Sequence, residues 1–423
     1  MIAPPGRISS FLAGRVLCSH YPMSKRILIF SLNYYPFVGG AEIAIKEITD
    51  RISEEGIEFH LIAYRFDANC PCVERIGNVT VHRVGIGVKG ATAGGTFHPI
   101  AYIGKILYVP LAAYKAWRLH RANQFDTFWA MMSYMLFPIV LLRMVGVRKP
   151  YLLTIQEGDP FERVFERLRI RIFAPLLKYG FQNATAIQAI SSFLLTWARE
   201  LGFTGHGEVI PNGVDTATFA KDFSAAERAE IKEKLEKKES DVFLVTTSRL
   251  VHKNAVDDVI RALTHLPENI SFLIYGSGPD EQALRMLAKE QGVEKRARFM
   301  GQASYTELPA ILSACDIFIR PSRSEGMGNS FIEAMAAGIP VIATQEGGIA
   351  DFLFDAERNP EKPTTGWAVN ADNPEQIGAA VKNILAHPAE VERVTKTAKT
   401  MVIENYDWNL LAGRMKTLFD GLT

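Results

Sequence analysis

The sequence is poor in cysteine, with only Cys18, Cys70, Cys72 and Cys315 among 423 residues. So few and so scattered cysteines exclude a disulfide-rich scaffold and indicate a reducing compartment. Cys70 and Cys72 have the C-x-C spacing of half a metal site. No second pair accompanies them, which favours an ordinary loop.

Long hydrophobic runs are also lacking, since no stretch reaches the roughly 18 uninterrupted apolar residues of a membrane-spanning helix. The nearest, residues 131–147, contains Pro138 and Arg143 and predicts a buried helix. The N-terminus lacks the apolar core and cleavage site of a signal peptide. Because Met23 directly precedes the first predicted strand, we expect residues 1–22 to be a disordered tail or an extension from an upstream start.

Charge of one sign is not in excess, because the net charge is +1. This balance argues against a nucleic-acid partner bound by bulk attraction. A composition with 48% hydrophobic and 22% charged residues is typical of a globular protein. A chain of this length exceeds one ordinary core, so we expect two domains.

Apolar strand patterns alternate with helical patterns twice along the chain. The first series begins with an apolar run at 26–32, a helical segment at 41–56 and a second run at 57–65. The pattern restarts after a charged helical segment at 225–240. This repetition predicts an α/β protein with two Rossmann-like, doubly wound domains that face each other across a cleft. We expect the domains at 23–205 and 206–404, followed by an amphipathic helix at 405–423 that could cross back to the first domain.

Two glycine pairs follow predicted strands. Gly39 and Gly40 could present backbone amides to a phosphate or carboxylate at a helix N-terminus, or could simply allow a tight turn. Gly276 and Gly278 match half of a dinucleotide fingerprint. Glu281 replaces the third glycine, which argues against an NAD site.

Arg249 and Lys253 follow a strong strand of the second domain. Two cations at the carboxyl end of a strand suit a diphosphate, although solvated loop charges are the more common case. Asp257 and Asp258 come next. They could form a metal site, but at a helix start they more often complement the helix dipole.

Gln156, Glu157 and Asp159 follow a strand of the first domain. Such groups could bind sugar hydroxyls or act on a reacting hydroxyl, whereas Asp159 followed by Pro160 could also be a plain turn. Residues 161–180 alternate apolar side chains with basic ones, as in a helix that lies on anionic lipid or in an ordinary surface helix. The basic residues are Arg163, Arg167, Arg169, Arg171 and Lys178.

A glycine-rich loop at 323–329 joins a strand to a helix that should end at Gly338. If Ser330 is the N-cap, Glu333 would be the fourth member of a Ser-x-x-Glu capping box. Glu325 has no comparable structural explanation and is therefore the stronger candidate for a binding residue.

Several motifs together resemble the family-4 retaining glycosyltransferases of the GT-B fold. They are GGAE at 39–42, VIPNGVD at 209–215, SRLVHKN at 248–254, IYGSGP at 274–279, the block from Ala314 to Thr344, and ENYDW at 404–408. The resemblance covers nearly the whole chain from Met23. It implies a metal-independent hexosyltransferase that uses no cofactor and moves a sugar from a nucleotide diphosphate sugar. The implied acceptor is a growing glycan or lipid-linked saccharide of polysaccharide biosynthesis, at the cytoplasmic face of the membrane, with peripheral membrane contact and no nucleic acid.

The resemblance also implies roles for individual residues. Glu325 would contact the donor sugar, Glu333 the ribose, and Arg249 and Lys253 the diphosphate. The backbone amides of Gly326, Met327, Gly328 and Asn329 would surround the sugar and phosphate, and Gly39 and Gly40 would face them across the cleft.

The sequence departs from the family at two places. The segment between Arg249 and Lys253 is one residue shorter than in many members. A histidine common after the first-domain strand is absent, so Gln156, Glu157 or Asp159 could supply that contact. A nucleotide-sugar epimerase of the same fold and a non-catalytic sugar-binding relative remain as alternatives.

Overall fold

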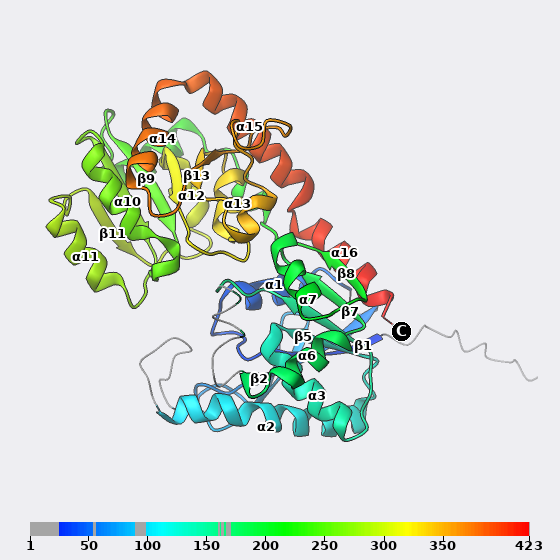
Figure 1. The fold of residues 1–423 in the computed structure, drawn as a ribbon. Helices are drawn as coiled ribbons and strands as arrows, with labels where there is room; N and C mark the ends of the chain where they lie inside the picture. The colour runs from blue at the N-terminus through cyan, green and yellow to red at the C-terminus, as the bar shows by residue number, and fades with distance from the viewer. Residues whose placement is uncertain are drawn as a thin grey trace, which may run out of the picture.

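The computed structural model describes residues 25–53, 56–88, 99–159, 161, 165 and 171–422 (Figure 1). Two separate sheets form the centres of two domains. The first contains β1 (Lys25–Phe30), β2 (Ile57–Tyr64), β3 (Val73–Ile76), β4 (Val79–Val84), β5 (Thr127–Met131), β6 (Tyr151–Ile155), β7 (Ala186–Ala189) and β8 (His206–Val209). The second contains β9 (Val242–Thr247), β10 (Ile270–Tyr275), β11 (Ala297–Gly301), β12 (Ile317–Arg320), β13 (Val341–Ala343) and β14 (Trp367–Ala368).

The strand orders confirm the predicted doubly wound arrangement. The first sheet runs β3-β4-β2-β1-β5-β6-β7-β8, and the second runs β11-β10-β9-β12-β13-β14. All neighbouring strands are parallel except β3 and β4. Every residue of β5 and β6 is buried, because helices cover both faces of a parallel sheet.

Helices connect the strands of each sheet. In the first domain they are α1 (Gly40–Asp50), α2 (Pro99–Asn123), η1 (Ser133–Met135), α3 (Leu136–Met144), α6 (Ala174–Gln182) and α7 (Ser192–Glu200). The second domain has α8 (Thr216–Phe219), α9 (Ala225–Lys234), η2 (His252–Asn254), α10 (Val256–Ala262), η3 (Leu263–His265), α11 (Glu281–Glu290), α12 (Leu308–Ala314), α13 (Asn329–Ala336), η4 (Gly347–Asp351), α14 (Pro374–Ala386) and α15 (Pro388–Asn405). The helix expected within 131–147 is η1 followed by α3. Pro138 lies in the first turn of α3, where its missing amide hydrogen removes no helical hydrogen bond.

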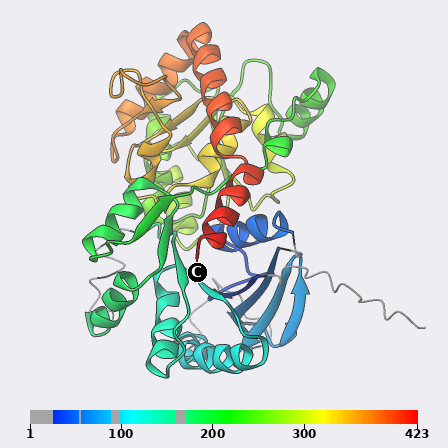
Figure 2. The same ribbon diagram turned by 90° about the vertical axis from the view of Figure 1, so that its right-hand side faces the viewer.

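The first sheet continues past residue 205, because β8 pairs with β7 in parallel. The last helix, α16 (Trp408–Asp420), also packs on this sheet. The Phe419 ring lies 5.0 Å from Trp129 and 5.9 Å from Phe59, and Lys25 Nζ donates to the carbonyl of Phe419 at 2.6 Å. Figure 2 shows α15 and α16 running from the second domain down to the first. The chain therefore crosses between the domains twice.

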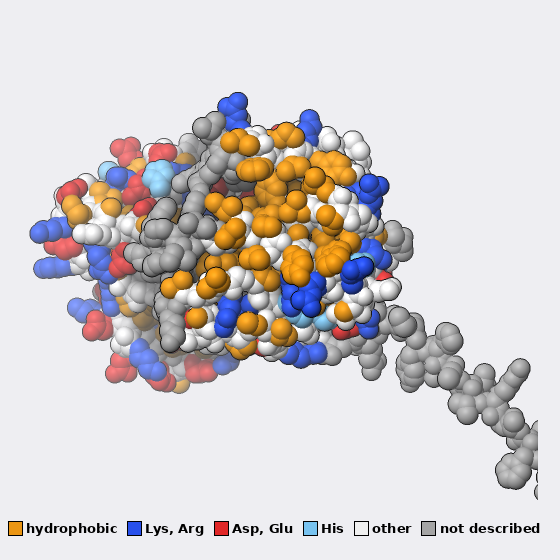
Figure 3. Space-filling view, turned by 90° about the horizontal axis from the view of Figure 1, so that it is seen from below, with side chains coloured by type: hydrophobic (Ala, Val, Ile, Leu, Met, Phe, Trp, Pro, Cys, Tyr) orange, Lys and Arg blue, Asp and Glu red, His pale blue; other side chains and the backbone are white. Residues whose placement is uncertain are grey.

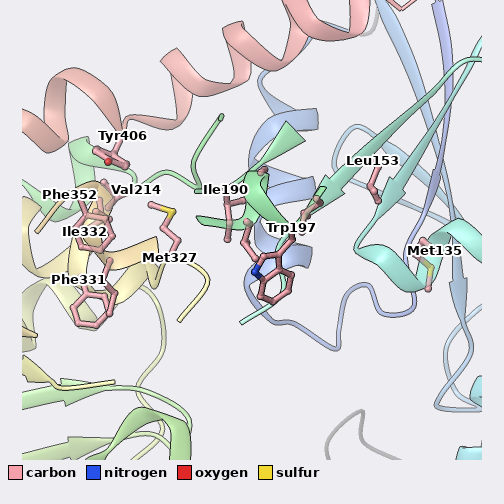
Figure 4. Close-up of a cluster of buried hydrophobic side chains, with 14 of the residues drawn as sticks. Met135, Leu153, Ile190, Trp197, Val214, Met327, Phe331, Ile332, Phe352 and Tyr406 are labelled. Atoms are coloured by element: carbon pink, nitrogen blue, oxygen red, sulfur yellow. The ribbon is translucent and has the colours of Figure 1, made fainter. Parts of the chain in front are cut away.

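An apolar cluster joins the two domains (Figure 4). Met327, Phe331 and Ile332 of the second domain belong to the same buried cluster as Ile190 and Trp197 of the first. This continuous packing fixes the two domains against each other, and polar residues from both can therefore meet at defined distances.

Two predictions concern segments that the structure does not describe. Residues 1–22 lie outside the described residues, and so do 160, 162–164 and 166–170, which include Arg163, Arg167 and Arg169 of the predicted basic helix at 161–180. Within the described ranges, no helix has the length and hydrophobicity needed to cross a bilayer.

Candidate active site

The loop after β12 leads directly into α13, as predicted, but the start of this helix differs from the expected capping box. Gly328 is the N-cap, with a φ of 87° that a side chain would oppose. Ser330 is inside the first turn, and its hydroxyl accepts a hydrogen bond from Arg320 Nη1 at 2.8 Å. The capping-box interpretation of Glu333 is therefore wrong.

A buried arginine at the end of β12 organises this loop. Arg320 Nη2 donates to Glu325 Oε2 at 2.7 Å, and the guanidinium lies 4.2 Å from the centre of the Phe331 ring. Burial lowers the pKa of Arg320, and the nearby carboxylates of Glu325 and Glu333 oppose that shift. Sequence reasoning missed Arg320. The available signal was a lone arginine at the end of an apolar strand.

Glu333 is buried in the second turn of α13, with 8% of its surface exposed. Burial raises the pKa of its carboxyl group to about 7, although Arg320 pulls the pKa in the opposite direction. Within the described parts of the chain, its carboxylate has no hydrogen-bond or ion-pair partner. A buried carboxyl group without a partner can accept hydrogen bonds from a hydroxyl-bearing ligand.

Lys253 of the second domain reaches the loop that follows β6 of the first. Its Nζ donates to the carbonyl oxygen of Gly158 at 2.7 Å. A Cβ atom built on Gly158 would lie 2.5 Å from Lys253 Nζ and 3.6 Å from Glu325 Oε1. The structure thus brings Lys253 and Glu325 together at one point. Arg249 follows the same strand, β9, and is exposed.

The loop of Glu325 touches the first domain through its backbone. A Cβ atom on Gly326 would lie 2.3 Å from the carbonyl oxygen of Glu157. A Cβ atom on Gly348 would lie 1.9 Å from the carbonyl oxygen of Gly326, and Gly348 N donates to the carbonyl of Glu325 at 3.0 Å. Glycine at these positions is required by close approach of backbone rather than by a positive φ.

Asn212 connects the first-domain strand end to the loop that starts α13. Its Nδ2 lies 3.2 Å from Gln156 Oε1 and 3.3 Å from Asn329 Oδ1, and its backbone amide lies 3.3 Å from Met327 Sδ. Gln156, Met327 and Asn329 were predicted site residues, and the structure joins them through this one side chain. The sequence pattern predicted no role for Asn212, although this residue lies in the VIPNGVD motif at 209–215.

The two acids after β6 differ in environment. Glu157 is buried, and its carboxylate accepts hydrogen bonds from the backbone amides of Ser133 at 2.7 Å and Gln156 at 2.9 Å. Burial raises the pKa of Glu157, and these hydrogen bonds oppose the increase. The carboxylate thus orders the ends of β5 and β6. Asp159 is partly exposed and, among the described residues, has no hydrogen-bond partner.

Gly39 and Gly40 lie at the N-terminus of α1 and are exposed. The amide of Gly39 donates to Glu42 Oε2 at 2.7 Å, so this helix start already has an anionic partner. Between the described residues, no contact joins either glycine to Lys253 or Glu325. Their part in donor binding remains a prediction.

The other glycine pair and the aspartate pair have structural partners. Cβ atoms on Gly276 and Gly278 would lie 1.9 Å from the carbonyl of Ser248 and 2.1 Å from that of Leu250. Arg323 Nη1 lies 2.8 Å from Asp257, and Arg323 Nη2 lies 2.9 Å from Asp258. The aspartates thus anchor the loop that carries Glu325. Among the described residues, no three or more His, Cys, Asp or Glu side chains are grouped so that they could hold a metal ion.

Solved structures with this fold confirm the architecture. Sucrose-phosphate synthase from Thermosynechococcus elongatus has a TM-score of 0.78 at 19% identity and covers 94% of this chain and 99% of its own. The HepE protein of Anabaena, solved with UDP and glucose, has a TM-score of 0.72 at 17% identity, with 94% and 100% covered. The chain therefore has the GT-B fold.

A curated relative gives a more specific likeness. It is a GDP-mannose-dependent alpha-(1-6)-phosphatidylinositol monomannoside mannosyltransferase of Mycolicibacterium smegmatis, 31% identical over 224 residues. The match covers 51% of this chain and 56% of the relative, so the chain spans just over half the length of the curated relatives that it matches first.

Two family models match successive halves of the chain. The model described as Glycosyltransferase Family 4 matches residues 38–218, and the model described as Glycosyl transferases group 1 matches residues 227–401. The first contains the strands from β2 to β8, and the second contains Arg249, Lys253, Glu325 and Glu333. With both halves matched in order, the chain belongs to the family-4 glycosyltransferases of the GT-B fold.

Proposed function

We propose that the protein transfers a sugar from a nucleotide diphosphate sugar to an acceptor hydroxyl with retention of configuration at the anomeric carbon. The observation that carries the proposal is the convergence of Lys253 and Glu325 on Gly158, between the carboxyl ends of strands from both sheets. Ligands of open α/β sheets bind at such strand ends. A cation and a carboxylate at one point suit a donor that has both a diphosphate and sugar hydroxyls.

The donor would lie along the loop from Glu325 to Glu333. Glu325 is held by Arg320 and would accept hydrogen bonds from sugar hydroxyls. The amides from Gly326 to Asn329 would surround the sugar and phosphate at the start of α13. Glu333 lacks a partner in the described residues and would accept from the ribose hydroxyls, as the family resemblance implies.

Lys253 and Arg249 would stabilise the negative charge that develops on the departing diphosphate. Stabilisation of developing charge by fixed groups is usually the largest single contribution to catalysis. Lys253 Nζ would exchange its hydrogen bond with the Gly158 carbonyl for one with a phosphate oxygen. Arg249, exposed in the described structure, would turn toward the same group.

The family resemblance implies a substitution on one face of the sugar. The bond between the anomeric carbon and the diphosphate oxygen breaks, and the acceptor oxygen forms a bond to that carbon on the same side. The acceptor proton passes to the leaving phosphate oxygen. Glu157 takes no part as a nucleophile, because backbone amides already occupy both of its carboxylate oxygens. The proposed reaction needs neither a metal nor a cofactor.

The acceptor would approach from the first domain. Asp159 follows β6 and is the acid of this loop whose carboxylate is open to a ligand within the described structure, so we assign it to the acceptor hydroxyl. Gln156 would contact the acceptor or the sugar beside it. The mannosyltransferases that match are named for a phosphatidylinositol mannoside acceptor. We therefore propose a lipid-linked saccharide or growing glycan as acceptor, at the cytoplasmic membrane face.

A thermal-shift panel of UDP, GDP, UDP-glucose and GDP-mannose tests the donor. HepE was solved with UDP and glucose, whereas the mannosyltransferases are named as GDP-mannose-dependent, so both bases belong in the panel. A ligand at about 100 times its dissociation constant adds about 2.7 kcal/mol to stability. We expect GDP-mannose to give the larger shift. No shift with any member would contradict the donor assignment.

The reaction itself is tested by incubating the donor with and without a lipid-linked acceptor. Glycosylated acceptor with retained configuration, formed equally in the presence of EDTA, would support the proposal. An epimerised sugar formed without acceptor would replace it with an epimerase, and loss of activity in EDTA would overturn metal independence. Glu325→Gln should abolish transfer while leaving nucleotide binding intact.

A further inference from the structure

Helix α2 exposes apolar side chains over its N-terminal half. Leu107, Leu111 and Tyr114 are 50%, 39% and 57% exposed, and they recur at the spacing of one helix face. Tyr108 and Ala112 lie on the buried face. The helix thus presents an apolar stripe outward as well as a second one to the core, which is unusual for a helix on the surface of a globular protein.

Neighbouring helices continue this apolar surface. Helix α2 packs against α3, and α3 packs against α6. Met144 and Val145 at the end of α3 are 70% and 67% exposed, and Ile172 and Phe173 before α6 are 71% and 50% exposed. Figure 3 shows the apolar side chains gathered into one broad patch on the underside of the molecule. A contiguous apolar patch of this kind marks an interaction surface.

We call this surface the α2–α3–α6 face and define it by its exposed side chains. The apolar members are Ile106, Leu107, Leu111, Tyr114, Met144, Val145, Ile172, Phe173 and Tyr179, and the basic members are Arg118, Arg121, Arg148, Arg171 and Lys178.

The charge of the α2–α3–α6 face has one sign. Helices α2, α3 and α6 contain no aspartate or glutamate, and Asp126 is the only acid between residues 99 and 156. Lys and Arg side chains lie at the margin of the apolar patch in Figure 3. Because the whole chain has a net charge of only +1, this segregation is a property of the surface rather than of the composition.

We propose that the α2–α3–α6 face binds the surface of an anionic phospholipid bilayer. The apolar stripe would enter the boundary between headgroups and acyl chains, while the lysines and arginines contact lipid phosphates. A second copy of the chain is a poorer occupant, because a two-fold interface would place two cationic surfaces against each other. The proposal does not depend on the sugar transferred or on the reaction.

Sedimentation with vesicles tests the proposal on the full chain. We expect binding to vesicles of equal parts phosphatidylglycerol and phosphatidylcholine, with weaker binding to phosphatidylcholine alone and as salt increases. The double variant Arg118→Glu/Lys178→Glu should lower the partition coefficient by at least about tenfold, because each cation near the surface contributes roughly a factor of five. The double variant Leu107→Ser/Tyr114→Ser should weaken binding to both kinds of vesicle.

Matched control variants on the second domain show whether vesicle binding depends on the α2–α3–α6 face or only on the overall charge and hydrophobicity of the protein. Lys289→Glu/Lys295→Glu and Met286→Ser/Leu385→Ser change exposed residues of the same kinds and should leave vesicle binding unchanged. Equal losses in these controls, or equal binding to both vesicle compositions, would overturn the proposal. Sedimentation equilibrium measures self-association. If the protein is a dimer and the variants of the α2–α3–α6 face are monomers, the face mediates self-association instead. Nucleotide binding by every variant should match the wild type, which also confirms folding.

Discussion

Arg320 Nη2 and Glu325 Oε2 lie 2.7 Å apart, and the two side chains are 7% and 13% exposed. The same guanidinium donates to Ser330 at the start of α13 and is close enough to Glu333 to influence its pKa. One arginine therefore orders the loop carboxylate, the helix start and the second carboxylate. The donor site depends on this arginine even though the proposed donor contacts are made by other residues.

Replacement of Arg320 by leucine should reduce both stability and activity. Removal of one partner from a buried ion pair costs about 3 kcal/mol or more, because the other charge stays buried without compensation. Urea unfolding should show this loss, and transfer should fall by about 100-fold because Glu325 is no longer oriented. Arg320→Lys should recover part of the stability and part of the activity, since lysine retains the positive charge but lacks the several N–H donors of the guanidinium group.

Lys234→Leu is the matched control for this variant. It breaks the exposed pair of Lys234 and Glu230, in which both side chains are at least 65% exposed. Such exposed pairs contribute little to stability, because water screens both charges. If Arg320→Leu unfolded at the same urea concentration as Lys234→Leu, the proposed role of Arg320 would be wrong.

Glu333 should make the stability of the ligand-free protein depend on pH. Its folded pKa of about 7 is above the ordinary value of 4.5, so the folded state binds more protons than the unfolded state between these values. Stability should therefore decrease as pH rises through this window. Above pH 7 the ionisation of Glu333 should lower the free energy of unfolding by at most about 3 kcal/mol.

Glu333→Gln should remove this dependence, because glutamine does not ionise. Urea unfolding of variant and wild type should give stabilities that agree at low pH, diverge as pH rises from 4.5 to about 7 and stay apart above that, with the variant the more stable. A constant difference between the two proteins at every pH would contradict the prediction, because it would show that Glu333 has the same pKa in the folded and unfolded states.

Lys253→Ala should weaken binding of nucleoside diphosphates much more than binding of the nucleosides. Loss of one charge-assisted hydrogen bond costs about 1.5–3 kcal/mol, or roughly 10-fold to 100-fold in affinity. Titration calorimetry with GDP, UDP, guanosine and uridine measures the difference. Lys289→Ala on α11 is the control and should change neither affinity. Equal weakening for nucleoside and diphosphate would instead indicate that Lys253 acts by fixing the domain arrangement through Gly158.

Gly328→Ala should destabilise the protein by about 1 kcal/mol or more, because φ at this position is 87°. The added Cβ would also lie 2.5 Å from Arg320 Nη2, so transfer activity should fall as well. Gly413→Ala offers an opposite control, since it lies in α16 with nothing within 4 Å of the added atom. That change should stabilise the helix by about 0.5–1 kcal/mol. A neutral effect at Gly328 would mean that the loop can adopt another backbone conformation.

The strand pattern of the sequence predicted the fold well, because parallel strands buried on both faces are continuous apolar runs. The runs at 26–32 and 57–65 correspond to β1 and β2 with shifts of one or two residues. The first sheet continues to Val209 because β8 pairs with β7, which local pattern does not specify. The predicted capping box of Ser330 and Glu333 was wrong because it, too, depends on a contact outside the local segment. Ser330 has the right spacing for an N-cap, but a distant strand residue, Arg320, binds its hydroxyl.

The sequence by itself determined two α/β domains, the loop between β12 and α13, and the pair of glutamates, because each depends on neighbouring residues or short motifs. Only the tertiary structure decided that Lys253 meets Glu325 at Gly158, that backbone amides hold Glu157, and that α16 packs on the first sheet. It also decided that Glu333 is buried beside Arg320, which sets its pKa. These outcomes depend on contacts between segments far apart in the chain, and local spacing contains no information on which of them form.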